Sequence, residues 1–231
     1  MKNIVDTSKH DRKSKNNLTV ACVFNLQKNP RGEDYNINWV DRLNRACKRN
    51  IDMEFEFVCL SNVPTPYKTI PLISSSNGYW NKIELFRKDL FFGPVLYLDL
   101  DVLVCKNITN QILSLPTNKL LMTKEPYRDI VNSSIMYWSG DYSSLFTQYL
   151  ENKKSIIKKY ATPGLRFGDQ SYISEHIDFD FVESYTQENF IAWRHHKVQT
   201  AIDDPSLLVF TSKQKPSNNL EMDLVKKHWI N

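Results

Sequence analysis

Two aspartates one residue apart, Asp99 and Asp101, end one of the most apolar stretches of the chain, residues 95–98. That stretch has no polar alternation, which favours a strand buried on both faces, and Gly93-Pro94 supplies a turn before it. Because side chains alternate along a strand, the two carboxylates should share one face, roughly 6.6 Å apart. Neighbouring acids in such a place repel each other unless a cation lies between them. The pattern predicts Mg²⁺ or Mn²⁺ held by Asp99 and Asp101, with water and phosphate completing its shell.

A plainer alternative is that one aspartate caps the next turn and the other is solvated. The elements around the pair favour the site. The first hundred residues alternate between strands at 18–24, 54–60 and 95–98 and helices at 34–50 and 79–92. This alternation predicts a nucleotide-binding α/β half with a parallel sheet. Ligands of open α/β sheets bind at the carboxyl ends of the strands, which is where the aspartates fall.

The second half of the chain is less regular. A short helix starts at Thr109 or Asn110 and stops at Pro116, and further strands are expected at 119–123 and 132–138. Residues 145–159 have the pattern of an amphipathic helix with a lysine-rich exposed face. No internal repeat divides the chain.

Composition places the protein among ordinary globular chains. It has 231 residues, of which 41% are hydrophobic and 24% charged, enough for a full core. The net charge of +4 is mild, and no block of lysine and arginine forms a nucleic-acid arm. The four cysteines include no Cys-x-x-Cys pair, so we expect buried free thiols in a reducing cytoplasm. No signal segment or bilayer-length apolar run is present, which also favours the cytoplasm.

Further segments, taken in order, resemble the glycosyltransferases of the GT-A fold that carry an Asp-x-Asp motif, particularly compact bacterial and viral members distantly like glycogenin. The resemblance runs from about residue 18 to residue 216. The segments that carry it are Trp80-Asn-Lys82-Ile-Glu-Leu-Phe86, Val95 to Val104, Asn132-Ser-Ser-Ile-Met136, Gly168-Asp-Gln170 and Ser184-Tyr185.

The resemblance implies one α/β domain with a mixed, mainly parallel sheet flanked by helices. After a flexible lead-in at residues 1–16, this GT-A domain would span 17–231, with a nucleotide-binding half at 17–105 and an acceptor half at 106–231. The implied activity is metal-assisted transfer of a sugar from a nucleotide-sugar donor, a UDP-sugar, to a hydroxyl acceptor. That acceptor could be a glycan, a protein hydroxyl or a hydroxymethylated base in modified viral DNA.

The resemblance also implies roles for individual residues. Asp99 and Asp101 would engage the donor ribose and the metal, with Asp101 the direct ligand. Lys82 would approach the donor's phosphates or sugar, while Asn132 and Asp169 would face the transferred sugar and the incoming hydroxyl. Plainer roles exist for each: a solvated helix residue for Lys82, a turn for Asn132 and a helix N-cap for Asp169. Further donor contacts are expected from Asn25, Trp80, Lys213 and Lys215.

The chain departs from the family near its C-terminus. Family members commonly read Phe-His-Gly-Lys-Pro-Lys-Pro, whereas this chain reads Phe210-Thr-Ser-Lys-Gln-Lys-Pro216. Lys215 is kept, and a lysine there suits a diphosphate leaving group. The histidine that is the third metal ligand in many relatives is Thr211. Either another group completes the metal shell or the metal binds more weakly. His195, His196 and His228 are the candidates to replace the histidine, and each has the plainer role of a surface or packing residue.

Two other classes of protein fit parts of the pattern. Asp99-Leu-Asp-Val-Leu103 also satisfies the motif of haloacid-dehalogenase-like phosphohydrolases, in which Asp99 would be the nucleophile and Asp101 the acid/base. That motif normally lies on the first strand, whereas two strand-helix units precede it here. A non-catalytic sugar-nucleotide-binding module is the second alternative, motivated by Thr211. Turnover of donor distinguishes this module from a transferase.

Overall fold

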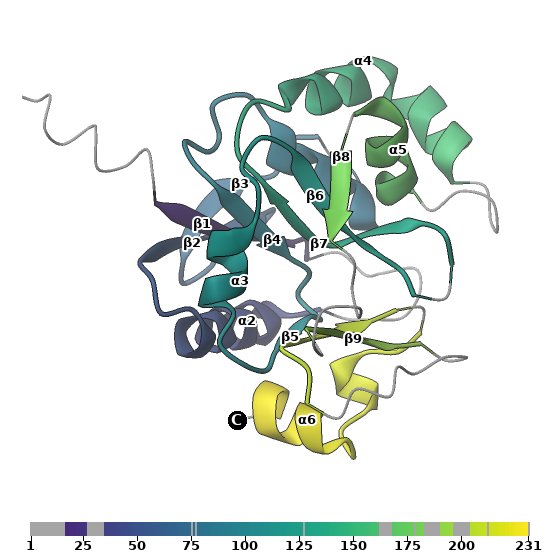
Figure 1. The fold of residues 1–231 in the computed structure, drawn as a ribbon. Helices are drawn as coiled ribbons and strands as arrows, with labels where there is room; N and C mark the ends of the chain where they lie inside the picture. The colour runs from purple at the N-terminus through teal and green to yellow at the C-terminus, as the bar shows by residue number, and fades with distance from the viewer. Residues whose placement is uncertain are drawn as a thin grey trace, which may run out of the picture.

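The computed structural model describes residues 17–26, 35–74, 76, 78–126, 128–161, 168–177, 179–182, 190–195, 204–211 and 213–230. The expected lead-in at 1–16, the Ser184-Tyr185 segment and His196 lie outside these residues. Two sheets and the helices around them make up the described fold (Figure 1). None of the described helices has the length and apolar composition needed to cross a bilayer.

The main sheet has seven strands in the order β3-β2-β1-β4-β7-β6-β8. Strands β3, β2, β1 and β4 run parallel, β7 is antiparallel to both of its neighbours, and β8 is parallel to β6. The carboxyl ends of β1 to β4 therefore meet the start of β7 at one edge, here called the carboxyl edge. The strand bounds are β1 Leu18–Phe24, β2 Phe55–Ser61, β3 Lys68–Pro71, β4 Val95–Leu98, β6 Leu120–Lys124, β7 Val131–Trp138 and β8 Phe179–Val182.

A second, three-stranded sheet has the order β5-β10-β9, with β5 Leu103–Val104, β9 Ile191–Arg194 and β10 Leu207–Phe210. Strand β5 begins two residues after Asp101, and β10 pairs antiparallel with it. The residues that follow β10 therefore lie near Asp99 and Asp101. It continues through the short helices η2 Pro216–Asn218, α6 Asp223–Val225 and η3 Lys226–Ile230.

Two hydrophobic cores cover the two faces of the main sheet. On β1, Val20 and Cys22 enter one core and Ala21 the other, as the alternation of side chains requires. The first core contains helix α2 Ile37–Asn50, helix α3 Thr109–Ser114 and the small sheet. The second contains helix η1 Gly78–Phe86, α4 Ser143–Tyr160 and α5 Asp169–His176. In Figure 1 α4 and α5 lie above the sheet and α2 below it.

Helix α2 shows why the sequence folds as it does here. Asn36 caps it by accepting a hydrogen bond from the Asn38 N–H at 3.0 Å, and Lys48 and Arg49 lie in its last turn, where cations favour the helix dipole. Its apolar side chains, including Trp39 and Leu43, are buried against the sheet. All four cysteines are buried and free, as expected from their spacing.

The α-helix predicted at residues 79–92 is not what the structure contains. The structure has a 3-10 helix at Gly78–Phe86, and it ends six residues earlier than expected. Trp80, Ile83 and Phe86 are all buried and lie three residues apart. Three residues is the period of a 3-10 helix, so this winding turns all three side chains toward the core.

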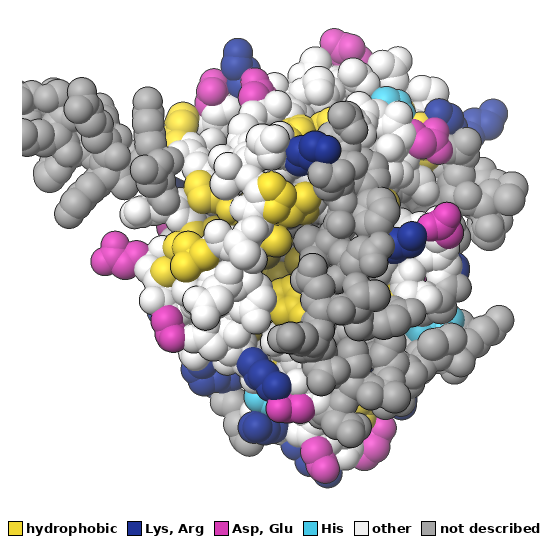
Figure 2. Space-filling model, in the orientation of Figure 1, with side chains coloured by type: hydrophobic (Ala, Val, Ile, Leu, Met, Phe, Trp, Pro, Cys, Tyr) yellow, Lys and Arg dark blue, Asp and Glu magenta, His cyan; other side chains and the backbone are white. Residues whose placement is uncertain are grey.

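Figure 2 draws one face of the molecule, and the side chains that it colours show no concentration of positive charge. Lysines and arginines are scattered there, while hydrophobic side chains gather beside α3, where Leu113 is exposed. This agrees with the mild net charge of the sequence.

Candidate functional site

Asp99 and Asp101 lie in a turn directly after β4 and not on an extended strand. The Val102 N–H donates to the Asp99 carbonyl at 3.1 Å, which closes the turn. The expectation that the two carboxylates share one face of a strand is therefore wrong. Each acid instead has a lysine of its own, Lys82 for Asp99 and Lys215 for Asp101. The repulsion foreseen from the sequence is relieved by two ammonium groups.

Lys82 contacts two of the three aspartates of the site. Its Nζ lies 2.9 Å from both carboxylate oxygens of Asp99, 3.2 Å from the Ser133 Oγ and 3.8 Å from an Asp169 oxygen. The side chain is only 12% exposed, so it is not a solvated helix residue. Burial alone would lower the pKa of Lys82, but Asp99 and Asp169 outweigh it and hold the pKa above its ordinary value. The lysine is thus a fixed cation.

Asp99 is held from three sides. Besides Lys82, the Tyr97 hydroxyl donates to its Oδ1, and its own N–H donates to the Ser134 carbonyl at 2.8 Å. Burial would raise the pKa of Asp99, yet Lys82 and Tyr97 lower it below the ordinary value. The register of Leu98 opposite Ile135 explains the contact with Ser134, because the start of β7 runs on past the end of β4.

Asp169 is the first residue of α5, and Gly168 occupies the N-cap position. Asp169 is therefore not the N-cap. Its carboxylate accepts a hydrogen bond from the Ser133 Oγ at 2.6 Å and faces Lys82. Burial raises the pKa of Asp169, against the opposing influence of Lys82 and Ser133. A buried carboxylate with a raised pKa is suited to accept a proton.

Asn132 lies on β7 beside a fourth acid, Glu125. Its amide nitrogen donates to the Glu125 Oε1 at 2.9 Å, and its amide oxygen accepts the Ser134 N–H at 2.8 Å. Glu125 is buried and forms an ion pair with Arg128. Asn132 is thus not in a turn: it makes a local hydrogen bond within β7, where the register with β6 shifts, and it connects this strand to a buried carboxylate.

Lys215 brings the far end of the chain to the site. Its Nζ donates to the Asp101 Oδ2, which also accepts the Tyr35 hydroxyl at 3.1 Å. Burial would lower the pKa of Lys215, but Asp101 and Tyr35 raise it well above its ordinary value. The pKa of the Tyr35 hydroxyl is raised, mainly by burial and next by the negative charge of Asp101. Lys213, expected beside the donor as well, is exposed.

Asn25 and Trp80 have different surroundings. Asn25 follows β1 at the carboxyl edge; its Nδ2 donates to the Ser76 carbonyl at 3.3 Å, and its buried Oδ1 has no hydrogen-bond partner within the described ranges. Trp80 is 5% exposed, and its ring stacks on Tyr149 with 5.5 Å between centroids. The prediction that Trp80 contacts the donor is corrected, because its ring is packed in the hydrophobic core.

Sequence reasoning missed several residues of the site. Ser133 and Tyr97 could have been found from their neighbours, since each lies within two residues of a predicted site residue. Glu125 follows a predicted strand, which is a weaker signal. Nothing in the sequence placed Tyr35 beside Asp101, 66 residues away.

A metal would find two carboxylates at this site, each already paired with a lysine. Within the residues that the structure describes, no three His, Cys, Asp or Glu side chains come together as ligands. Thr211 is buried directly after β10, and its N–H donates to the Arg194 carbonyl at 3.0 Å. Asp99 and Asp101 fit Mg²⁺ or Mn²⁺ when phosphate oxygens complete the shell, since these ions bind through one or two carboxylates.

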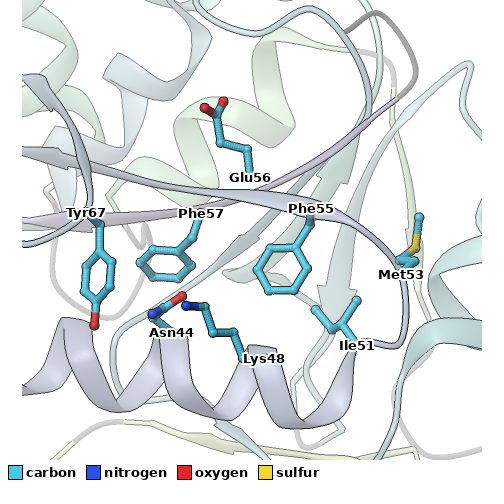
Figure 3. A pocket seen from close by; sticks show the side chains of 8 residues that line it. All are labelled: Asn44, Lys48, Ile51, Met53, Phe55, Glu56, Phe57 and Tyr67. Atoms are coloured by element: carbon cyan, nitrogen blue, oxygen red, sulfur yellow. The ribbon is translucent and has the colours of Figure 1, made fainter. Parts of the chain in front are cut away.

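A pocket of about 520 Å³ lies away from these groups, between α2 and the first half of β2 (Figure 3). In the parallel register Phe55 pairs with Leu18, at the opposite end of β1 from Asn25. Six residues of strand separate the two levels, or about 20 Å. The pocket is therefore not part of the candidate site. Its lining residues are Asn44, Lys48, Ile51, Met53, Phe55, Glu56, Phe57 and Tyr67.

Comparison with known proteins rests on structure alone. No family model matches the chain, and no curated protein matches its sequence. Among solved structures, an active-site mutant of LgtC superposes with a TM-score of 0.59 at 10% identity, over 92% of this chain and 94% of LgtC. The glycosyltransferase GlyE of Streptococcus pneumoniae TIGR4 gives 0.61 at 13% identity, over 93% of this chain and 60% of GlyE.

The bifunctional glycosyltransferase WbbM gives a TM-score of 0.59 at 10% identity, over 99% of this chain and 50% of WbbM. The chain thus spans most of LgtC, but only 60% of GlyE and half of WbbM. The three are glycosyltransferases, and the architecture they share with this chain is an α/β fold with a mainly parallel sheet. The chain has the GT-A glycosyltransferase fold. The resemblance read from the sequence is confirmed at the level of the fold.

Proposed function

We propose that the protein is a glycosyltransferase that moves a sugar from a nucleotide-sugar donor, a UDP-sugar, to a hydroxyl acceptor. One observation carries the proposal: Asp99, Asp101 and Asp169 meet Lys82 and Lys215 at the carboxyl edge of a GT-A fold. A solved complex of the galactosyltransferase LgtC holds donor and acceptor sugar analogues, which supports a shared use of this fold.

The donor half of the site would serve the leaving group. Transfer leaves negative charge on the departing nucleoside diphosphate, and preorganised cations stabilise such charge. Lys82 and Lys215 are buried cations with raised pKa values, so they stay protonated at neutral pH. A bound Mg²⁺ or Mn²⁺, held by Asp99 and Asp101, would supply further positive charge to the same diphosphate.

The acceptor half would serve the incoming hydroxyl. Asp169 is the group to orient that hydroxyl and take its proton, because its pKa is raised and Ser133 fixes one of its oxygens. Asn132 and Glu125 would face the transferred sugar. A glycan, a protein hydroxyl and a hydroxymethylated DNA base are the acceptor classes to test.

We treat residues 17–231 as one transferase domain whose two halves share the site. Residues 17–105 supply Lys82, Asp99 and Asp101, while residues 106–231 supply Asp169 and also Lys215, which pairs with Asp101. The division into a nucleotide half and an acceptor half is thus not strict. Buried free cysteines agree with the cytoplasmic location that we propose.

A donor screen tests the proposal. Each common sugar nucleotide is incubated with the protein and added Mn²⁺ or Mg²⁺, and released nucleoside diphosphate is measured. We expect release from one donor class, increased by the correct acceptor. Binding without turnover would instead favour a non-catalytic sugar-nucleotide module. A covalent aspartyl-phosphate trapped on Asp99 would favour the phosphohydrolase.

A further inference from the structure

Glu84 is a completely buried carboxylate that the proposed chemistry does not use. It lies on η1, two residues after Lys82, with 0% of its surface exposed. It accepts hydrogen bonds from the Ile73 N–H at 2.8 Å, the Ser74 N–H at 2.8 Å and the Ser74 Oγ at 2.6 Å. Arg87 lies 3.3 Å from it. A charge is tolerated in such a place only when its partners are this complete.

Two partners of Glu84, Ile73 and Ser74, lie in the stretch that follows β3 at the carboxyl edge, of which the structure describes residues 72–74 and 76; it is here called the 72–76 segment. The Leu72 N–H donates to the Ser61 carbonyl at 3.0 Å, so the segment starts beside the end of β2. Arg87 also donates to the Pro71 carbonyl at 2.9 Å, just before the segment. Lys153 of α4 donates to the Ser74 carbonyl. Residues 71–74 are thus held by the buried Glu84 of η1, by the part-buried Arg87 directly after η1 and by the part-buried Lys153 of α4.

A chain of hydrogen bonds continues from Glu84 to Asn25. The Ser74 and Ser76 hydroxyls are 2.7 Å apart, and the Ser76 hydroxyl is 2.8 Å from the Tyr149 hydroxyl. The Ser76 carbonyl accepts the Asn25 Nδ2 at 3.3 Å. Because a carbonyl can only accept, it forces the Asn25 amide to present its oxygen on the other side. That buried Oδ1 has no partner in the described part of the chain.

We propose that Glu84 is a positioning residue for donor binding, acting through the 72–76 segment on Asn25. By fixing the Ser76 carbonyl it sets the orientation of the Asn25 amide, so that Oδ1 accepts an N–H from the donor's base. This inference rests on the proposed function and deepens it. A hydrogen-bond acceptor on the protein favours a base with an N–H on the facing edge. Uracil has such an N–H at its ring nitrogen N3, whereas the same nitrogen of cytosine is itself an acceptor. Helix η1 would then align both ends of the donor, the diphosphate through Lys82 and the base through Glu84.

A double-mutant cycle with titration calorimetry tests the inference, with UDP and CDP as probes. Glu84→Gln keeps the side-chain shape but turns one acceptor into a donor that faces amide N–H groups. We expect it to weaken UDP binding about tenfold, corresponding to the loss of a charge-assisted hydrogen bond, and to reduce the preference for UDP over CDP. In the Asn25→Ala background it should cause no further loss, because the two residues act in series.

Glu151→Gln is the matched control, since Glu151 is an exposed acid on α4. It should leave both affinities unchanged. Hydrogen exchange at the Ile73 and Ser74 amides gives a readout that needs no nucleotide, and both amides should exchange faster in Glu84→Gln. If that variant does not fold, Ser74→Ala removes a single hydroxyl of the same network and should shift binding in the same direction by a smaller factor.

The outcomes separate this inference from the proposed function. Wild-type protein that binds no nucleoside diphosphate would overturn both. Wild-type binding of UDP that Glu84→Gln and Ser74→Ala leave intact would overturn the role of Glu84 alone. Additive losses in the double variant would show that Glu84 does not act through Asn25.

Discussion

Asp101 receives hydrogen bonds from residues far apart in the chain, Tyr35 on one side and Lys215 on the other. Asp101→Asn keeps the size of the side chain and removes its charge. We expect transfer to fall by about 100-fold to 1,000-fold, because Asp101 would no longer hold Lys215 and the metal, the cations that stabilise the diphosphate in the transition state. The measurement is donor-saturated turnover with metal present. Wild-type turnover in a variant with an unchanged circular dichroism spectrum would contradict the assignment.

Asp169 should show its role in the dependence of transfer on pH. Burial raises its pKa, and a general base acts only when deprotonated, so kcat/KM should rise as pH increases through this raised value and then level off. Asp169→Asn should lower transfer about 100-fold or more, remove that rise and leave donor affinity nearly unchanged. Joint loss of donor binding and stability would show that the residue is structural.

Thr211 tests how a metal is held in this chain. An imidazole binds Mn²⁺-like ions well and a threonine hydroxyl binds them poorly, so metal alone should give little heat in titration calorimetry, while metal with nucleoside diphosphate should bind readily. Thr211→His should increase binding of metal alone. Thr211→Phe is the control, since it adds a ring without a ligand nitrogen. Tight metal binding by the donor-free wild type would point to His195, His196 or His228 as a ligand.

At the scale of elements, the turn into α5 depends on Gly168. Its φ is +65°, and an added Cβ would lie 2.1 Å from the Tyr79 ring. Gly168→Ala should destabilise the fold by about 1–3 kcal/mol through backbone strain, with the ring contact adding to this, and should displace Asp169. Gly78→Ala is a matched control, because its φ is +57° and its Cβ would meet nothing within 4 Å. Thermal unfolding of both variants should show the larger loss at Gly168; equal losses would contradict the ring contact.

Elements that coincide with an apolar run following a clear turn or lead-in can be predicted from the sequence, and elements set by distant partners cannot. The sequence predicts β1 with its observed bounds, and β4 likewise, because each is a continuous apolar run. Strands β5, β9 and β10 have two to four residues, and β5 finds its partner β10 about one hundred residues further along the chain, which local patterns do not report. The winding of η1 also escapes prediction, because its buried positions fit both three and 3.6 residues per turn over a short span.

At the scale of the whole molecule, the site combines residues that the sequence can name with contacts that it cannot. Motifs single out Lys82, Asp99, Asp101, Asn132, Asp169 and Lys215, and the structure places them along one edge of the sheet. Their pairing could not be derived, since Lys215 reaches Asp101 across 114 residues only after β10 has joined β5. Residue types thus predict the chemistry, while topology determines which charges meet.

The pairing of each acid with a lysine affects how quickly a donor can reach the site. Three carboxylates and two ammonium groups leave the cluster with a single negative charge when all are ionised. A nucleotide sugar that carries its metal is itself nearly neutral, so little electrostatic attraction acts beyond the screening length of about 8 Å at physiological ionic strength. Association should therefore proceed by ordinary diffusion, without the steering that strongly charged clefts provide, and its rate should depend only weakly on salt.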